Sequence, residues 1–320
     1  IYFTFDRNYV LGACVAFHSL LKNISKEYKC HMYVLHTKLL ESDCQKMKRV
    51  VDRFSNATIS FINVSTYEEQ LARISPKGHF SKEIFYKLVA AEVFPQYDRI
   101  VCSDVDVVFK DDLTSILSLY QEDDFYFAGV GPIENSRMDV YKKKFSDDEI
   151  RILEHEIAAG LLFMNLKKIR EDNIQQRLLD YYLKNYNRFF LPEQDCIILT
   201  CWPDIKYLPM KYVVPNTFYS LDMNGREFYQ GNTQFAGDNA IALKKFNDAL
   251  DNPIQLHYVG FNKPWNSLFV AKQRHWMAEM VDSKCLWLYI SEIPYNFIVL
   301  RIKRYNVSRF LKKLKNRLWV

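Results

Sequence analysis

Glycine is scarce in this chain, and its scarcity limits how the chain can hold a nucleotide. Only nine of the 320 residues are glycine, and none of them forms the pattern G-x-x-x-x-G-K. That pattern is a loop whose backbone amides surround the phosphates in one large class of nucleotide-binding proteins. The sequence therefore excludes a phosphate-binding loop of this kind.

Closely paired cysteines are also missing. The seven cysteines include no C-x-x-C pair, and most of them lie in apolar runs. A structural zinc site needs closely spaced cysteine or histidine ligands, whereas buried reduced thiols are typical of cytosolic proteins. We therefore predict reduced cysteines and no structural zinc.

Long apolar stretches are absent as well. No run approaches the roughly 20 apolar residues that a membrane-spanning helix needs, and no signal peptide is visible. The chain is nevertheless 49% hydrophobic and 25% charged, which is the balance of a globular protein. These observations predict a folded cytoplasmic protein without a transmembrane helix.

Positive charge is concentrated at the C-terminus. Residues 301–320 hold eight Lys or Arg residues and no acid, although the net charge of the whole chain is only +5. The rest of the chain is near neutral, so we expect no nucleic-acid partner. Apolar residues recur at helical spacing in this tail, which predicts a basic amphipathic helix. Two interpretations stay open: peripheral attachment to the anionic cytoplasmic face of the inner membrane, or packing on the chain's own domain.

The N-terminal half alternates between strand and helix patterns. Strand patterns cover residues 1–5, 29–36, 58–64 and 99–102, and helical spacing covers 10–21, 40–54 and 83–94. A further strand is predicted over 159–164 and a helix over 174–186. This alternation predicts βαβ units and an α/β, Rossmann-like, mainly parallel sheet flanked by helices. Because ligands bind at the carboxyl edge of such sheets, Asp6 and Asp104, which each follow a strand, are expected at the ligand site.

Two aspartates, Asp104 and Asp106, follow the strand predicted over 99–102. Residues two apart in an extended segment point the same way, so the carboxylates converge, and a divalent cation between them would relieve their repulsion. Mg²⁺ and Mn²⁺ take oxygen ligands and bridge diphosphates. A solvated turn is the alternative, but the two aspartates lie between apolar runs, which solvation alone explains poorly.

A second polar group lies in the sequence HYVGFNKPW, residues 257–265. His257 can supply a nitrogen ligand to the same metal, Gly260 allows close approach of the backbone to a phosphate, and Lys263 offers a positive charge to a diphosphate. Alone, these residues would be a structural histidine and a surface turn. Together with the two aspartates they indicate a metal site that binds a diphosphate.

Five segments in the same order resemble glycosyltransferase family 8. They are FDRNY, YKLVAAEVFPQYDRIVCSDVDVVFKDDL, AAGLLFMNLKKIR, PEQDCI and LHYVGFNKPW, and they cover about residues 1–266. This family includes glycogenin and bacterial lipopolysaccharide galactosyl- and glucosyltransferases, and the likeness is to the bacterial branch. The resemblance implies a GT-A fold, UDP-glucose or UDP-galactose as donor, Mn²⁺ or Mg²⁺ as cofactor, and retention of the anomeric configuration.

The resemblance also implies roles for individual residues. The metal ligands would be Asp104, Asp106 and His257. The sugar nucleotide would be bound by Asp6 and Asn8 at the uracil and ribose, by Gly260 and Lys263 at the diphosphate, and by Lys87, Asp104 and Val105.

Gln194 stands at the position that relatives place beneath the anomeric carbon. Because Gln194 is neutral and a poor nucleophile, we expect same-face attack, in which it stabilises an oxocarbenium-like centre while Glu193 or Asp195 assists through its charge. Asp195 as a covalent nucleophile is the alternative. A helix N-terminus, whose dipole favours both acids, also explains this stretch.

Three positions depart from the family pattern. Ala158 replaces an asparagine, Gly131 stands where relatives often have an acid, and Lys87 replaces an arginine. The missing amide at residue 158 leaves the identity of the hexose open. Two alternatives to a transferase follow: a catalytically weakened relative that binds a sugar nucleotide or glycan, and a metal-dependent nucleotidyltransferase, which the shortage of glycine disfavours.

The expected organisation is a GT-A catalytic domain over residues 1–270, with a nucleotide-binding half over 1–110 and an acceptor-side half over 111–270. Residues 271–320 would be a helical, basic tail that associates with the membrane. The expected function is retaining transfer of a hexose from a UDP-sugar to a glycan or glycolipid acceptor, as in the synthesis of lipopolysaccharide or another surface glycan.

Overall fold

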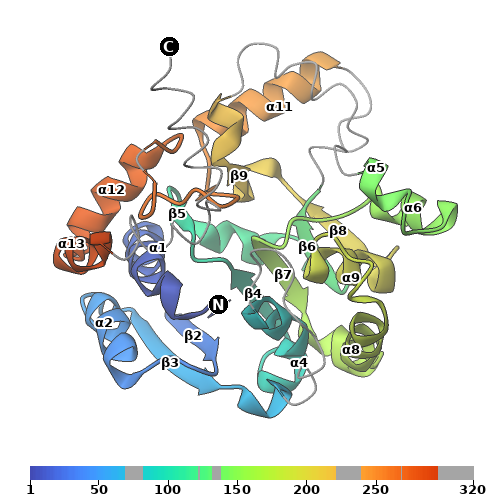
Figure 1. Cartoon of the computed structure of the whole chain (residues 1–320), viewed down its shortest axis with the longest axis horizontal. Helices are drawn as coiled ribbons and strands as arrows, with labels where there is room; N and C mark the ends of the chain where they lie inside the picture. The colour runs from blue at the N-terminus through green and yellow to red at the C-terminus, as the bar shows by residue number, and fades with distance from the viewer. Residues whose placement is uncertain (69–81, 122, 132–137, 221–238, 268, 295–320) are drawn as a thin grey trace, which may run out of the picture.

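The first strands of the chain form the parallel part of a seven-stranded sheet (Figure 1). The computed structural model describes residues 1–68, 82–121, 123–131, 138–220, 239–267 and 269–294. In this sheet β1 (Tyr2–Thr4) pairs in parallel with β2 (Cys30–His36) and β4 (Arg99–Ser103), and β3 (Ala57–Asn63) pairs in parallel with β2. These segments are rich in β-branched and aromatic residues, which fit a pleated, buried surface.

The second half of the sheet contains its one antiparallel strand. The strand order is β3-β2-β1-β4-β7-β6-β8, in which β7 (Leu161–Asn165) runs antiparallel to β4 and to β6 (Phe127–Val130). The last strand, β8 (Ile205–Leu208), is parallel to β6. The prediction of a mainly parallel sheet flanked by helices is thus confirmed.

Helices cover both faces of the sheet. Side chains of alternate residues in a strand point to opposite faces and pack in two different cores. Phe3 and Val101 pack in one core with α1 (Val10–Asn23), whereas their neighbours Tyr2 and Ile100 pack in the other with η3 and α8. The first core also contains residues of α2 (Glu41–Val51), α11 (Asn239–Asp251), α12 (Gln273–Asp282) and α13 (Leu286–Pro294). The second core is built from η3 (Lys82–Val89), α4 (Ala90–Val93), α5 (Met138–Tyr141), α6 (Asp147–Leu153), α7 (Leu166–Glu171), α8 (Ile174–Asn185) and α9 (Pro192–Cys201).

A second, three-stranded sheet lies beside the carboxyl edge of the large one. Its strands are β5 (Val107–Phe109), β10 (Gln255–His257) and β9 (Val214–Pro215), with β10 antiparallel to β5 and parallel to β9. The register places His257 opposite Val107. This pairing places His257, the first residue of the HYVGFNKPW segment, next to the strand that directly follows Asp104 and Asp106.

Short 3₁₀ helices complete the described chain. They are η1 (Arg7–Tyr9), η2 (Ser65–Tyr67), η4 (Leu113–Ser118), η5 (Met210–Tyr212) and η6 (Asn216–Ser220). Within the described residues, no helix is long and apolar enough to cross a membrane. The basic tail at residues 301–320 lies outside the described residues, so the helix predicted there stays a prediction.

The helix predicted over residues 83–94 is wrong over most of its length. Residues Lys82–Val89 form the 3₁₀ helix η3, and only Ala90–Val93 are α-helical. Two side chains of β1 donate hydrogen bonds to backbone carbonyl groups of this segment. The Thr4 hydroxyl donates to the Glu83 carbonyl at 2.6 Å, and the Tyr2 hydroxyl donates to the Lys87 carbonyl at 3.1 Å. Tertiary hydrogen bonds of this kind compete with the regular α-helical pattern.

Candidate active site

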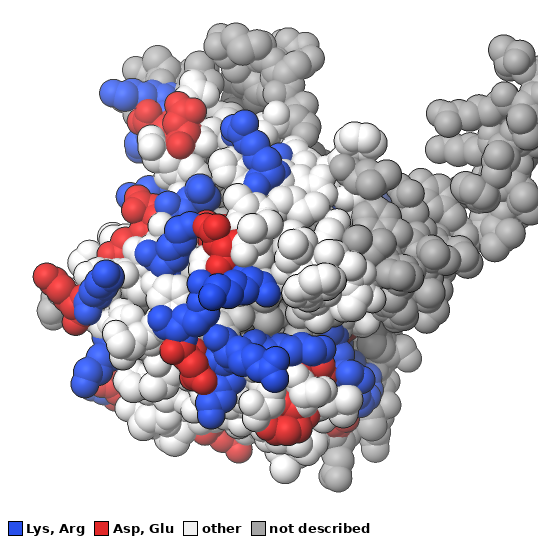
Figure 2. All heavy atoms as spheres, turned by 90° about the vertical axis from the view of Figure 1, so that its left-hand side faces the viewer, with Lys and Arg blue, Asp and Glu red and all other residues white. Residues whose placement is uncertain are grey.

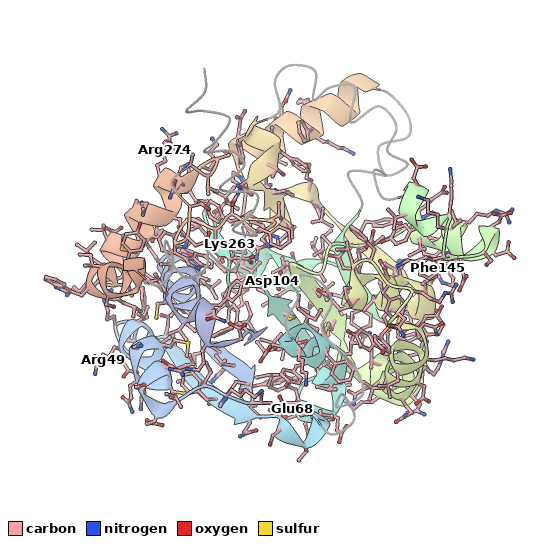
Figure 3. The ribbon with its side chains drawn as sticks, in the orientation of Figure 1. Arg49, Glu68, Asp104, Phe145, Lys263 and Arg274 are labelled. Carbon is pink, nitrogen blue, oxygen red and sulfur yellow. The ribbon has the colours of Figure 1, made fainter. Side chains whose placement is uncertain are left out.

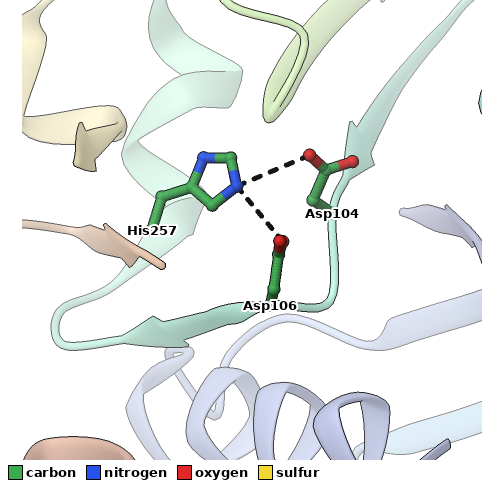
Figure 4. A group of neighbouring side chains, drawn as sticks. All are labelled: Asp104, Asp106 and His257. Carbon is green, nitrogen blue, oxygen red and sulfur yellow. Dashed lines mark ion pairs between the residues drawn. The ribbon is translucent and has the colours of Figure 1, made fainter. Parts of the chain in front are cut away.

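The turn after β4 and the end of β10 bring two aspartates and a histidine together (Figure 4). Asp104 and Asp106 lie between β4 and β5, and His257 is the last residue of β10. Nε2 of His257 lies 3.1 Å from Oδ1 of Asp106 and 3.6 Å from Oδ2 of Asp104. One ligand atom from each residue lies within 4.8 Å of the other two. We call these three residues the metal triad.

In each aspartate, the carboxylate oxygen that does not face His257 is bound by a lysine. Nζ of Lys87 lies 2.7 Å from Oδ1 of Asp104, and Nζ of Lys263 donates to Oδ2 of Asp106. In the view of Figure 3, Lys263 and Asp104 lie near the centre; Lys263 is buried and Asp104 is partly exposed. Each aspartate therefore has one oxygen bound to an ammonium group and the other facing His257.

Burial and opposite charge act against each other in this group. Burial disfavours the ionised form of Asp106, but the charges of Lys263 and His257 hold the pKa of that carboxyl well below its usual range. Burial likewise disfavours the charge on Lys87, but two neighbouring carboxylates raise the pKa of its ammonium group well above its usual value. At neutral pH, Asp106 is thus a carboxylate and Lys87 an ammonium ion.

Gly160 lies directly against the imidazole ring of His257. A Cβ atom on Gly160 would be 2.6 Å from Nδ1 and 2.7 Å from Cε1 of that ring. The Gly160 carbonyl also accepts a hydrogen bond from the Asp104 amide, at 3.0 Å. A side chain at residue 160 would collide with the ring of His257. Gly160 therefore helps to position two members of the metal triad, His257 through the absence of a side chain and Asp104 through the hydrogen bond.

Asp6 and Asn8 lie at the same sheet edge as the metal triad. Their segment follows β1, which pairs in parallel with β4. Asp6 precedes the turn η1, and its Oδ1 accepts a hydrogen bond from the Asn8 amide at 2.7 Å. The side chain of Asn8 is exposed. The sheet therefore brings this segment and Asp104 to one edge, as expected from the alternation of strands and helices.

The segment after β10 is held against helix α1. The Trp265 ring packs on Gly12, where a Cβ atom would come within 2.9 Å of the indole. Gly260 has φ +78°, a conformation that favours glycine, and a Cβ atom there would meet no other atom within 4 Å. Val105, between the two aspartates, is buried in the same core as Trp265. The Gly260 backbone is thus accessible, while Val105 anchors the turn.

The stretch Glu193-Gln194-Asp195 is the first turn of α9. Glu193 is buried; its Oε1 lies 3.5 Å from Nζ of Lys87, its Oε2 has no hydrogen-bond partner, and burial raises its pKa despite the lysine. Asp195 is fully buried and accepts three hydrogen bonds, from the Tyr141 hydroxyl at 2.6 Å and from two backbone amides, including that of Phe190 at 2.6 Å. Of the three side chains, only that of Gln194 belongs to a residue that is partly exposed.

Two of the positions that depart from the family pattern are adjacent in space. The Ala158 amide donates to the Val130 carbonyl at 2.8 Å, and Val130 precedes Gly131. Ala158 is partly exposed and Gly131 is buried. The third position, Lys87, binds Asp104 and Glu193 together.

Sequence reasoning missed two buried polar residues beside these groups. Nε2 of Gln255, a fully buried residue of β10, donates to the Ser103 hydroxyl at 2.8 Å. Glu156 is buried before β7 and accepts from Nε2 of Gln194 at 2.8 Å. Gln255 lies between Ile254 and Leu256, so a polar side chain between apolar ones was the available signal there, whereas Glu156 directly follows Glu154 and His155. Neither sequence context identifies a hydrogen-bond partner.

The metal triad suits a divalent cation. It combines two carboxylates with one imidazole, and carboxylates outnumber ammonium groups around it once Glu193 is counted. Carboxylate oxygens are ligands for Mg²⁺ and Mn²⁺, while an imidazole nitrogen favours the transition metal of the two. The residues present therefore fit a divalent ion with a mixed oxygen and nitrogen ligand set.

The fold and the site define a class of protein. A mainly parallel sheet carries an Asp-x-Asp pair after its central strand, and a histidine from a later strand joins that pair. Glycosyltransferases of the GT-A type share this fold, and solved glycosyltransferase structures are similar to the chain as a whole. The chain belongs to glycosyl transferase family 8, whose family model matches residues 1–268.

Two similar sequences are of bacterial origin. The chain is 21% identical over 264 residues to the lipopolysaccharide 1,2-glucosyltransferase of Escherichia coli (strain K12), covering 82% of this chain and 71% of that protein. It is 19% identical over 278 residues to General stress protein A of Bacillus subtilis (strain 168), covering 82% and 85%.

Two solved structures have the same fold. The galactosyltransferase LgtC in complex with donor and acceptor sugar analogs has a TM-score of 0.66 at 19% identity, covering 88% of this chain and 95% of LgtC. The apo structure of the bifunctional glycosyltransferase WbbM has a TM-score of 0.72 at 21% identity, covering 91% of this chain and 50% of that one. The chain thus spans half the length of the WbbM chain.

Proposed function

We propose that this family 8 chain is a retaining hexosyltransferase that moves glucose or galactose from a UDP-sugar to a glycan acceptor. The observation that carries the proposal is the metal triad with a lysine on each aspartate. A bound Mn²⁺ or Mg²⁺ would neutralise the diphosphate of the donor and so help UDP to leave. The lipopolysaccharide glucosyltransferase and the galactosyltransferase LgtC, both similar to this chain, support a hexose donor and a glycan acceptor.

The chain's own charged groups would hold the leaving diphosphate. Departure of UDP increases the negative charge on the diphosphate, and fixed positive groups in a partly buried site stabilise that charge strongly. Lys263 and Lys87 are held in the site by the aspartates before any substrate binds. Gly260 would let the backbone approach the diphosphate, and Asp6 with Asn8 would bind the uracil and ribose at the neighbouring strand end.

We assign retention to same-face attack with Gln194 beneath the anomeric carbon. Its amide oxygen would stabilise the positive charge that develops on the sugar, and the carboxylate of Glu193 would assist. Asp195 is a weaker candidate for a nucleophile, because three hydrogen bonds hold its carboxyl group inside the protein. A nucleophile must reach the reacting carbon, and such bonding opposes that movement.

We also propose that the C-terminal side attaches to an anionic membrane surface. In addition to the basic residues at 301–320, four apolar side chains of α12 and α13 are exposed. They are Val281 on α12 and Leu286, Trp287 and Ile290 on α13. Figure 2 shows many Lys and Arg side chains, with Asp and Glu side chains among them, on the side of the molecule that carries α2, α12 and α13. The exposed basic residues of these helices and of the segments that directly follow α2 and α12 are Lys48, Arg49, Arg53, Arg274 and Lys284. Apolar and basic side chains on one face suit the interface of an anionic bilayer.

The transfer reaction is tested by measuring UDP release from UDP-glucose and UDP-galactose with Mn²⁺. We expect release in the wild type and a loss of about 100-fold or more in Asp104→Asn and Asp106→Asn, since each change removes a ligand charge. Asp98→Asn, in an exposed acid, is the matched control and should behave as the wild type. Tight binding of UDP without release would instead favour a sugar-nucleotide-binding protein, and pyrophosphate release from a nucleoside triphosphate would favour a nucleotidyltransferase.

Membrane attachment is tested by sedimenting the full chain with vesicles of anionic or neutral lipid. We expect binding to anionic vesicles that weakens in Trp287→Ser, because this ring is 80% exposed. Leu117→Ser, which removes an exposed leucine from η4, is the control. Equal binding of all three proteins would exclude a role for this face.

A further inference from the structure

The side-chain amide of Gln194 is bound at both ends. Its Nε2 donates to Oε1 of Glu156 at 2.8 Å, and its Oε1 accepts from the Ala159 amide at 3.0 Å. A carboxylate only accepts hydrogen bonds and a backbone N–H only donates them. The amide of Gln194 can therefore satisfy both partners in one orientation only, with its oxygen toward Ala159.

Glu156 contributes a charge as well as a hydrogen bond. It is 3% exposed, in the segment between α6 and β7. Burial, together with the negative charge of Glu156, raises the pKa of the neighbouring Asp195 to about 8. A carboxylate that accepts from an amide N–H polarises the amide and increases the negative charge on its oxygen. The charge of Glu156 thus reaches the oxygen of Gln194.

Ala159 connects this amide to the metal triad. While its N–H donates to Gln194, its carbonyl accepts from Nζ of Lys87 at 2.9 Å. Lys87 in turn binds Asp104, and the next residue, Gly160, lies against His257. One residue, Ala159, therefore connects the side chain of Gln194 with the lysine that binds the metal triad.

We propose that Glu156 is a positioning residue for sugar transfer, which fixes the orientation of Gln194 and increases the negative charge on its oxygen. This inference rests on the proposed function, in which that oxygen faces the anomeric carbon as positive charge develops there. Glu156 acts through Gln194 and touches neither the sugar nor the diphosphate. It would lower the barrier to transfer with little effect on how tightly the donor binds.

The first test is a stability cycle that needs no substrate. Gln194→Glu places a second carboxylate 2.8 Å from that of Glu156, and two like charges this close disfavour the folded state. We expect the unfolding temperature of Gln194→Glu to fall by several degrees. Adding Glu156→Gln restores one carboxylate and one amide, so the double variant should recover most of the loss. If the double variant is as unstable as Gln194→Glu, the pairing of these residues is refuted.

The second test separates positioning from a structural role. Glu156→Gln keeps the size of the side chain and a carbonyl acceptor but removes the charge. We expect kcat for UDP release to fall about 10- to 100-fold while KM for the UDP-sugar changes less than about twofold. Glu154→Gln, two residues earlier on the same segment, is the matched control and should keep both constants.

The outcomes distinguish this inference from the function on which it rests. An unchanged kcat in Glu156→Gln, or kcat, KM and unfolding temperature all changing together, would refute the positioning role while the transferase stands. If the wild type releases no UDP from any UDP-sugar, the proposed function fails and the role of Glu156 in transfer fails with it.

Discussion

Gly160→Ala moves the metal ligand His257 by crowding its ring at Nδ1 and Cε1. The added Cβ would lie 2.6 Å from Nδ1 of His257 and 2.7 Å from Cε1. Since nonbonded contacts of this kind are favourable near about 3.5 Å, the ring must retreat by roughly 0.8–1 Å. Gly160 does not have a left-handed backbone conformation, so the ring contact is the source of the strain.

A movement of this size is large for the metal triad. Nε2 of His257 now lies 3.1 Å from Asp106 and 3.6 Å from Asp104. We expect the affinity for Mn²⁺ in the presence of UDP to fall about 10- to 100-fold, as when a residue that orients a metal ligand is lost. The rate of UDP release should fall about 100-fold, the usual effect of misplacing a reacting group by about 1 Å. The overpacking itself should lower the free energy of unfolding by about 1–3 kcal/mol.

The assay is calorimetric titration of Mn²⁺ into the protein with UDP, on four proteins. These are the wild type, Gly160→Ala, His257→Ala and the double variant. Without the imidazole, the methyl group at residue 160 has no ring to displace, so Gly160→Ala should add nothing to His257→Ala. The reasoning is refuted if Gly160→Ala binds Mn²⁺ like the wild type, or if it weakens binding equally with and without the imidazole.

Two further predictions concern the buried charges. Lys87→Met leaves Asp104 and Glu193 without their shared cation, so the free energy of unfolding in urea should fall by about 3–5 kcal/mol. Lys167→Met removes an exposed pair and should cost about 0.5 kcal/mol or less; similar losses in both variants would contradict the assigned burial. For Asp195, burial and the charge of Glu156 raise the pKa to about 8, so the folded protein keeps a proton that the unfolded chain loses near about pH 4. The stability contributed by this proton is complete below about pH 4 and is lost as pH rises toward 8, so wild-type stability should fall relative to Asp195→Asn across pH 5–8. A difference between the two proteins that stays constant with pH would argue against a protonated Asp195.

Local patterns were sufficient to predict five of the seven strands of the large sheet and, among its helices, α1, α2 and α8. The strands over 29–36 and 99–102 and the helix over 10–21 each have a period of hydrophobic residues that belongs to one type of structure. Strands β5, β9 and β10 have only two or three residues, which is too few to show a period. The 3₁₀ helix η3 escaped prediction for another reason, because side chains of β1 decide where its carbonyl groups bond.

By itself, the sequence determined the type of fold and predicted which residues meet at the ligand edge. Strand–helix alternation and strand ends at Asp6 and Asp104 suffice for a ligand edge, since period and order are local properties of a chain. Only the tertiary structure decided which oxygen of each aspartate faces His257, why Gly160 must lack a side chain, and that Glu156 binds Gln194. These contacts join residues far apart in the chain, 157 apart for Asp106 and Lys263 and 38 apart for Gln194 and Glu156. They depend on strand register and on the packing of α9 against α6, α8 and η3, and register and packing are set by the whole fold.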